Sequence, residues 1–191
     1  MAKAVVAAPK KKKPRAGKKF KKAMGWIIQI ILVLILSAIV SYGFFGVVVM
    51  QESSMEPTIR VNDHIRINKA AYLWGEPDRG DVIAFYKSES RTGSVQIKRV
   101  IGVPGDTIQI KDGFILLNGE TYMNNDEYSK INNAGLAEDP ILLKKGQYFV
   151  LGDNRNNSED SRFVDIGNID EGNIIGKAWM ITSPWSRFGF L

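Results

Sequence analysis

The residue whose chemistry first stands out is Ser54, within the stretch Gln-Glu-Ser-Ser-Met-Glu-Pro-Thr at residues 51–58. The stretch follows a long apolar run, and Pro57 disfavours a helical conformation at Glu56. We therefore expect Ser54 on an extended or turning piece of backbone. A serine in a turn is often only structural. Ser54 becomes a candidate nucleophile only if the chain also supplies a base that can take its proton.

The only histidine, His64, is the first candidate base, because a Ser-His-Asp triad requires one. It lies in the alternating segment 63–68, opposite in phase to Ile65 and Ile67. Alternation of this kind favours a histidine on the exposed face of a strand. A serine nucleophile then needs a different base, and lysine is the known substitute in acyl transfer.

Lys98 is the best placed lysine, because it lies in the middle of the β-branched segment Val-Gln-Ile-Lys-Arg-Val-Ile at residues 95–101. A lysine in water has a pKa near ~10.4 and is protonated at neutral pH. Burial against apolar side chains disfavours the ammonium, so it would supply a neutral amine that can act as a base. The alternative is that Lys98 and Arg99 are ordinary strand charges, one on each face of the strand.

A polar loop forms the third candidate element, Gly-Asp-Asn-Arg-Asn-Asn-Ser-Glu-Asp-Ser-Arg at residues 152–162. A calcium loop would need oxygen ligands at alternate positions and a glycine at the sixth. Arg155 at the third position and Ser158 at the sixth argue against one. Asn156-Asn157-Ser158 formally fits a glycosylation acceptor. The loop is then either a structural polar segment or the support of an active site.

The elements that must position these residues are predicted to be mainly β. Short alternating segments separated by glycine-bearing turns are typical of a β-rich domain. We expect strands at residues 63–68, 81–86, 94–102, 107–111, 114–117, 147–151 and 173–181. Asp112-Gly113 predicts a tight hairpin, because both residues tolerate positive φ. Residues 123–139 are expected as an exposed excursion, and Ala70–Trp74 as a short helical turn.

The chain begins with a basic tail, expected at residues 1–24. The first 22 residues hold ten Lys or Arg and no acidic residue, while residues 23–191 hold 16 basic against 20 acidic ones. Such a tail is predicted to be disordered and cytoplasmic. Its position beside an apolar run favours anionic lipid over nucleic acid as its partner.

The uncharged run Ala23–Gln51 predicts a single transmembrane helix at residues 25–46, followed by an extracytoplasmic catalytic domain at residues 47–191. The alternative is a cleaved signal peptide, but the run is too long and lacks a small-residue end. The chain has no cysteine and one histidine, so neither a disulfide nor a structural zinc site is expected.

Four sequence blocks, taken together, resemble bacterial type I signal peptidase over roughly residues 25–180. In the order of the family they are Ser-Met-Glu-Pro-Thr at 54–58, Arg-Gly-Asp-Val at 79–82, Ile-Lys-Arg-Val-Ile-Gly-Val-Pro-Gly-Asp at 97–106 and the polar loop at 152–162. The lysine and Gly-Asp-Asn-Arg blocks are highly specific for the family. The single apolar segment is similar to that of its compact members.

The resemblance implies a role for each matching residue. Ser54 matches the nucleophile, Lys98 the general base, and Ser158 the serine that positions the lysine amine by a hydrogen bond. Asp160 and Arg162 match a pair that braces the polar loop, and Asp153 and Arg155 stand in similar supporting places. The candidate linings of a shallow apolar substrate surface are Met55 and Ile97.

The family's oxyanion hole uses the backbone N–H of the nucleophile, and some members add a hydroxyl two residues earlier. That position is Glu52 here, which cannot donate a hydrogen bond when ionised. Ser53 is a candidate replacement.

The resemblance implies a membrane-anchored serine endopeptidase that removes signal peptides from exported preproteins without a metal or cofactor. Two other classes are weighed against it. A self-cleaving Ser/Lys repressor would need a DNA-binding domain in place of the basic tail and apolar run. A catalytically dead, membrane-anchored binding module would have lost Ser54 or Lys98, and the sequence holds both.

Overall fold

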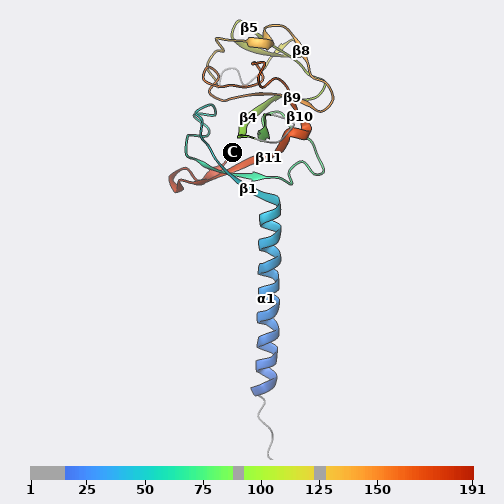
Figure 1. Ribbon diagram of the computed structural model, residues 1–191, viewed down its shortest axis with the longest axis vertical. Helices are drawn as coiled ribbons and strands as arrows, with labels where there is room; N and C mark the ends of the chain where they lie inside the picture. The colour runs from blue at the N-terminus through green and yellow to red at the C-terminus, as the bar shows by residue number, and fades with distance from the viewer. Residues whose placement is uncertain (1–15, 88–92, 123–127) are drawn as a thin grey trace, which may run out of the picture. The chain divides into compact units, whose positions relative to one another are not determined.

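The computed structural model of the 191-residue chain describes residues 16–87, 93–122 and 128–191. The chain divides into two compact units, Met1–Tyr42 and Gly43–Leu191. The first unit holds most of the helix α1, Ala16–Phe44, which Figure 1 shows as one continuous coil. The second unit holds the strands.

Helix α1 has the length and composition of a membrane span over Phe20–Phe44. Its 25 residues rise about 37 Å, which exceeds the roughly 30 Å hydrocarbon thickness of a bilayer. Large apolar side chains along it are exposed, among them Trp26 at 68% and Leu34 at 63%. An apolar helix that satisfies its own backbone hydrogen bonds and exposes its large apolar side chains is suited to lipid.

The helix also begins earlier than the sequence predicts. Residues 16–22 are helical, so the disorder expected for the basic tail is wrong for them. Alanine and lysine are good helix formers, and extending an existing helix needs no new nucleus. Residues 1–15 lie outside the described residues, and the rest of the tail stays a prediction. At its other end α1 stops at Phe44, two residues before the predicted end of the span, because Phe45 and Gly46 belong to the first strand.

The strands of the second unit form two antiparallel sheets, whose labelled strands lie in separate layers in Figure 1. The larger sheet has the order β1-β2-β11-β3-β4-β9-β10, and β12 pairs with β11. Its strands are β1 (Phe45–Val49), β2 (His64–Asn68), β3 (Val82–Tyr86), β4 (Val95–Gly102), β9 (Gln147–Leu151), β10 (Ile169–Asp170), β11 (Ile174–Ser183) and β12 (Gly189–Phe190).

The smaller sheet has the order β7-β6-β5-β8. Its strands are β5 (Thr107–Lys111), β6 (Phe114–Leu117), β7 (Glu120–Thr121) and β8 (Ile141–Leu142). The 3-10 helix η2 (Gly135–Glu138) lies between β7 and β8, whereas η3 (Glu171–Asn173) and η4 (Trp185–Arg187) lie between strands of the larger sheet. The predicted hairpin joins β5 to β6, and Asp112 and Gly113 both have positive φ, 54° and 82°.

Strand β3 is buried on both faces, which explains its unbroken apolar sequence. Val82 and Ala84 belong to one core cluster, while Ile83 and Phe85 belong to another. Beside it, β4 pairs with β3 from Val95 to Arg99, whereas β9 pairs with β4 only from Arg99 to Gly102. Within the described chain, the start of β4 therefore keeps one edge without a strand partner. Lys98 lies at the boundary between the paired and unpaired parts of that edge.

The mainly β architecture predicted from the sequence is confirmed, with each predicted strand found within two residues of its expected ends. The predicted helical turn at residues 70–74 is a series of turns and bends instead. Of the predicted excursion at 123–139, residues 123–127 lie outside the described residues, and the rest includes η2.

Candidate active site

Ser54 lies in a tight turn that follows β1. The N–H of Glu56 donates to the carbonyl of Ser53 at 3.1 Å, and the N–H of Ile59 donates to the carbonyl of Met55 at 2.9 Å. Met55 and Ile59 are fully buried in the core, so their packing fixes the position of the turn. Ser54 itself is only 3% exposed. The turn predicted from Pro57 thus fixes the position of the Ser54 hydroxyl.

Lys98 reaches this turn from β4, and its side chain has no exposed surface. Its Nζ lies 2.8 Å from Ser54 Oγ, although 44 positions separate the two residues in sequence. This distance is within hydrogen-bond reach, as proton transfer between a base and a nucleophile requires. The structure therefore brings together the two residues that the sequence marks as nucleophile and base.

Burial lowers the pKa of Lys98, because an ammonium loses its hydration inside the protein. The carboxylate of Glu52 acts in the opposite direction, followed by that of Asp160. Glu52 Oε2 lies 3.5 Å from Lys98 Nζ. The amine also contacts Gln96 Oε1 at 3.3 Å. The balance favours a lysine that loses its proton more readily than a lysine in water.

The polar loop after β9 is organised around a buried ion pair. Arg162 donates from Nε to Asp160 Oδ1 at 2.7 Å and from a terminal nitrogen to Oδ2 at 2.8 Å. Arg162 also donates to the backbone carbonyl of Arg155 at 2.6 Å, while Asp160 accepts from the N–H of Gly152 at 3.1 Å. Both charged side chains are nearly inaccessible. The pair thus fixes the loop at several points.

Asp153 ties the loop to β4. Arg99 binds both carboxylate oxygens of Asp153, at 2.8 and 2.7 Å, and also donates to the carbonyl of Gly80 at 2.8 Å. The bidentate geometry fixes the loop against the strand that carries Lys98. Arg155 is buried as well, with its guanidinium over the ring of Tyr128 at 4.2 Å. Burial lowers the pKa of Arg155.

Ser158 is close to the pair but does not make the bond that the resemblance implies. Its Oγ is buried and has no hydrogen-bond partner among the described residues, so the expected hydrogen bond to Lys98 is not formed here. Ser158 packs instead against Gly152, where an added Cβ would lie 2.3 Å from Ser158 Oγ and 2.4 Å from the carbonyl oxygen of Ser54. The backbone of the loop at Gly152 therefore packs closely against the backbone of Ser54.

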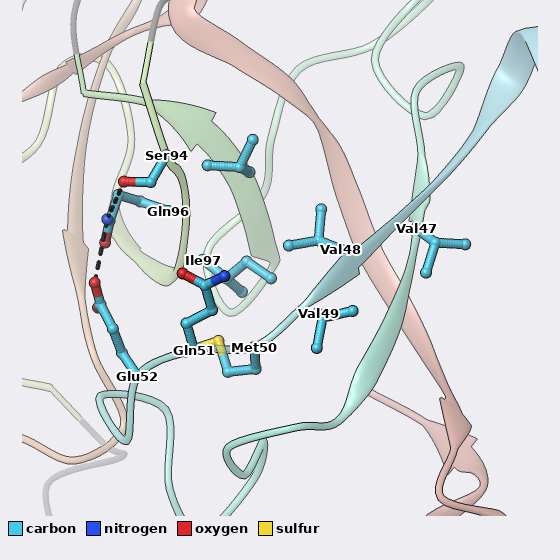
Figure 2. Close-up of a pocket in the computed structure, with 10 residues that line it drawn as sticks. Val47, Val48, Val49, Met50, Gln51, Glu52, Ser94, Gln96 and Ile97 are labelled. Carbon is cyan, nitrogen blue, oxygen red and sulfur yellow. Dashed lines mark hydrogen bonds between the residues drawn. The ribbon is translucent and has the colours of Figure 1, made fainter.

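A groove of about 550 Å³ is lined by residues that directly precede the Ser54 turn and Lys98 in the chain. Residues 47–52 form one wall and residues 94–97 form the other. Figure 2 shows the side chains that line it and the hydrogen bonds from Gln96 to Ser94 and Glu52. A second hollow, of about 580 Å³, is lined by residues 51–54, by Val61 and by residues 156–159. Both hollows share Gln51 and Glu52, which directly precede the turn that holds Ser54.

The two predicted substrate-binding residues lie in different places. Ile97 lines the first groove, whereas Met55 has no exposed surface and belongs to the core beneath it. The prediction for Met55 is therefore wrong: the turn directs its side chain inward, where it packs with the apolar cluster. His64 lies on the exposed side of β2, as its phase in the sequence predicts.

The sequence reasoning missed the role of Gln96 and underestimated Arg99. Gln96 lies two residues before Lys98 on the same strand, so the strand period of two places both side chains on one face. That spacing could have identified Gln96 as a partner of the lysine. Arg99 points away from Lys98, as expected, yet its bond to Asp153 gives it a structural role that spacing alone does not reveal.

No group of three or more His, Cys, Asp or Glu side chains within residues 16–87, 93–122 and 128–191 could hold a metal ion.

The family model described as "Signal peptidase, peptidase S26" matches residues 23–185 of the chain. The chain belongs to the signal peptidase family.

Relatives agree along almost the whole length of the chain. Signal peptidase I P of Bacillus subtilis subsp. natto is 36% identical over 171 residues, which cover 85% of this chain and 90% of that protein. Signal peptidase I T of Bacillus subtilis strain 168 is 34% identical over 180 residues, which cover 90% and 91%. A crystal structure of a signal peptidase I from Enterococcus faecalis is 32% identical and covers 53% of this chain and 96% of its own, with a TM-score of 0.41.

This signal peptidase is accordingly a membrane-anchored hydrolase that removes signal peptides, with α1 fitting the anchor. The family match spans both the anchor and the sheets, since it begins at residue 23 and ends at residue 185.

Proposed function

We propose that this signal peptidase cleaves with Ser54 as nucleophile and Lys98 as general base. The observation that carries the proposal is the 2.8 Å contact between Lys98 Nζ and Ser54 Oγ, made by two buried side chains. A neutral amine at this distance accepts the hydroxyl proton as Oγ attacks the scissile carbonyl. The resulting ammonium then gives its proton to the leaving amine as the acyl-enzyme forms.

Hydrolysis of the acyl-enzyme uses the same amine. Lys98 removes a proton from the attacking water, and the serine oxygen regains its proton as the ester bond breaks. The backbone N–H of Ser54 is the first oxyanion donor. Ser53 is the second: its Oγ accepts a hydrogen bond from Asn157 Nδ2 at 2.9 Å, which leaves its own hydroxyl hydrogen to donate.

The substrate is an exported preprotein bound in an extended conformation along the first groove. The unpaired edge of β4 at residues 95–98 supplies backbone hydrogen-bonding groups, and β1 forms the other edge strand. Peptides bind such edges by adding a strand, and the side chains at alternate positions meet the groove floor. The apolar lining of Val48 and Ile97 suits small apolar residues before the cut.

The N-terminus lies in the cytoplasm and the second unit outside. Ten basic residues precede the span, and cytoplasmic flanks of spans are enriched in Lys and Arg. The same residues bind anionic lipid headgroups on the cytoplasmic leaflet, because each basic group near that surface gains about 1 kcal/mol. Nucleic acid is not expected as a partner.

The decisive experiment incubates detergent-solubilised protein with a preprotein bearing an Ala-x-Ala site and measures the masses of the products. We expect cleavage directly after the second alanine, no cleavage by Ser54→Ala, and weakened cleavage by Ser53→Ala. Removal of one oxyanion donor typically costs about 10²–10³ in kcat. A dead Ser53→Ala enzyme beside an active Ser54→Ala enzyme would move the nucleophile by one residue.

A further inference from the structure

Glu52 bridges the mouth of the groove to the catalytic lysine. One oxygen of its carboxylate accepts a hydrogen bond from Gln96 Nε2 at 3.3 Å, and the other lies 3.5 Å from Lys98 Nζ. Gln96 completes a ring of three side chains, since its own Oε1 accepts from Lys98 Nζ at 3.3 Å. An acidic residue in this ring acts against a lysine that must be neutral to work as a base.

The Glu52 side chain is held loosely compared with its surroundings. It is 51% exposed, whereas Lys98 is not exposed at all. It lines both hollows and links the two walls of the first groove through Gln96 (Figure 2). A peptide that adds a strand to residues 95–98 runs between those walls. The peptide and the Glu52–Gln96 bridge therefore compete for the same space.

We propose that Glu52 is a positioning residue that favours the ammonium form of Lys98 in the free enzyme and is displaced when a peptide enters the groove. Resting on the proposed roles of Ser54 and Lys98, this inference makes the neutral base more available in the enzyme–substrate complex than in the free enzyme. Displacement moves the carboxylate into solvent, where its charge is screened, and the peptide excludes water from the amine. Both changes favour the neutral form of Lys98.

The other carboxylates near Lys98 cannot act in this way. Asp160 and Glu159, both in the polar loop, also stabilise the ammonium. Asp160 is bound by Arg162 and fully buried, so a substrate cannot move it. Glu159 lines the second hollow but not the first groove, and it has a weaker influence on Lys98 than Glu52 has. Arg99, the nearest basic side chain on β4, is bound to Asp153.

The test compares pH–rate profiles of wild type and Glu52→Gln in detergent, with an Ala-x-Ala preprotein as substrate. The profile of kcat/KM reports the ionisations of the free enzyme, and that of kcat reports those of the enzyme–substrate complex. Loss of the carboxylate lowers the pKa of Lys98 in the free enzyme. We therefore expect kcat/KM of Glu52→Gln to exceed that of wild type by about three- to tenfold on the acidic side of the profile. The acidic side of the kcat profile should not move.

Two variants sharpen the result. Glu120→Gln removes an exposed carboxylate from β7 in the smaller sheet, and it should leave both profiles unchanged. Gln96→Leu removes the donor that holds Glu52 and should shift kcat/KM in the same direction as Glu52→Gln, by less.

Equal shifts of kcat and kcat/KM in Glu52→Gln would overturn the proposal, because the carboxylate would then stay beside Lys98 in the complex. Unchanged profiles would overturn it as well. Failure of the proposed role of Lys98 as the base would give a different result. Lys98→Ala would then retain activity, both with Glu52 and with Gln at position 52.

Discussion

Two carboxylates, Glu52 and Asp160, both favour the ammonium form of Lys98, and they are held in contrasting ways. Asp160, in the polar loop, is fully buried and bound by the side chain of Arg162 through two hydrogen bonds and by the N–H of Gly152. Glu52, at the groove, is half exposed and accepts one hydrogen bond of 3.3 Å from Gln96. The loop side of the site is a fixed frame, and the groove side can change when a substrate binds.

The difference shows where rigidity is needed. The proposed mechanism requires the Ser54 hydroxyl and the Lys98 amine to stay within hydrogen-bond reach, and a small displacement of such a pair lowers the rate strongly. The polar loop supplies that precision by packing against the carbonyl of Ser54 and by binding Arg99 through Asp153. The groove must admit a peptide chain, and the hydrogen bond that links its two walls is made by the exposed side chain of Glu52.

The largest expected effect comes from breaking the frame. Arg162→Met leaves Asp160 buried without its charge partner, and removal of one member of a buried pair typically costs about 3–5 kcal/mol. We expect this loss in the free energy of unfolding, measured by denaturant titration, together with loss of peptidase activity. The exposed Arg60 provides the control, since Arg60→Met should change stability by less than about 0.5 kcal/mol. A stable, active Arg162→Met enzyme would show that the loop is not the frame.

A smaller effect is expected from Gly152→Ala. The added Cβ would lie 2.4 Å from the carbonyl oxygen of Ser54, and a backbone atom cannot rotate away as a side chain can. The turn must shift, so we expect kcat to fall at least about tenfold and stability by about 1–3 kcal/mol. Gly172→Ala is the matched control, because a Cβ there meets nothing within 4 Å. Equal kcat values for the two variants would argue that packing against Gly152 does not fix the position of Ser54.

The smallest effect is expected from His64→Ala. His64 is exposed on β2 and takes no part in either side of the site. Activity on the Ala-x-Ala preprotein should stay within about twofold of wild type, since exposed substitutions away from a site change little. A thousandfold loss in a folded protein would restore a histidine as the base and remove Lys98 from that role.

Much of the fold follows from the sequence. Alternating apolar residues predict the strands, and Asp112-Gly113 predicts the hairpin, because these signals depend on neighbouring residues alone. The short strands β7, β8, β10 and β12 were not predicted, since two residues carry no period. Strand β1 was partly assigned to the span, because its valines continue the apolar run and only the pairing with β2 shows that it is a strand.

The site was predictable in its residues and less so in its contacts. Ser54 and Lys98 could be named, because their sequence blocks are characteristic. The inward direction of Met55 depends on the fold of one turn. Ser158 Oγ packs on Gly152 without a hydrogen-bond partner among the described residues, which depends on the path of the whole loop. Distances between segments that lie 44 to 104 residues apart cannot be inferred from local patterns.

The most direct test of the central claim, that Lys98 is a buried base for Ser54, is the pH dependence of kcat/KM in the wild type beside Lys98→Arg. Only the neutral amine accepts a proton, so activity must rise as pH passes through the pKa of Lys98. Burial lowers that pKa, and the rise should be complete below the ~10.4 of a free lysine. Lys98→Arg should be inactive, because a guanidinium stays protonated. A rate still climbing at about pH 10, or an active Lys98→Arg enzyme, would contradict the account.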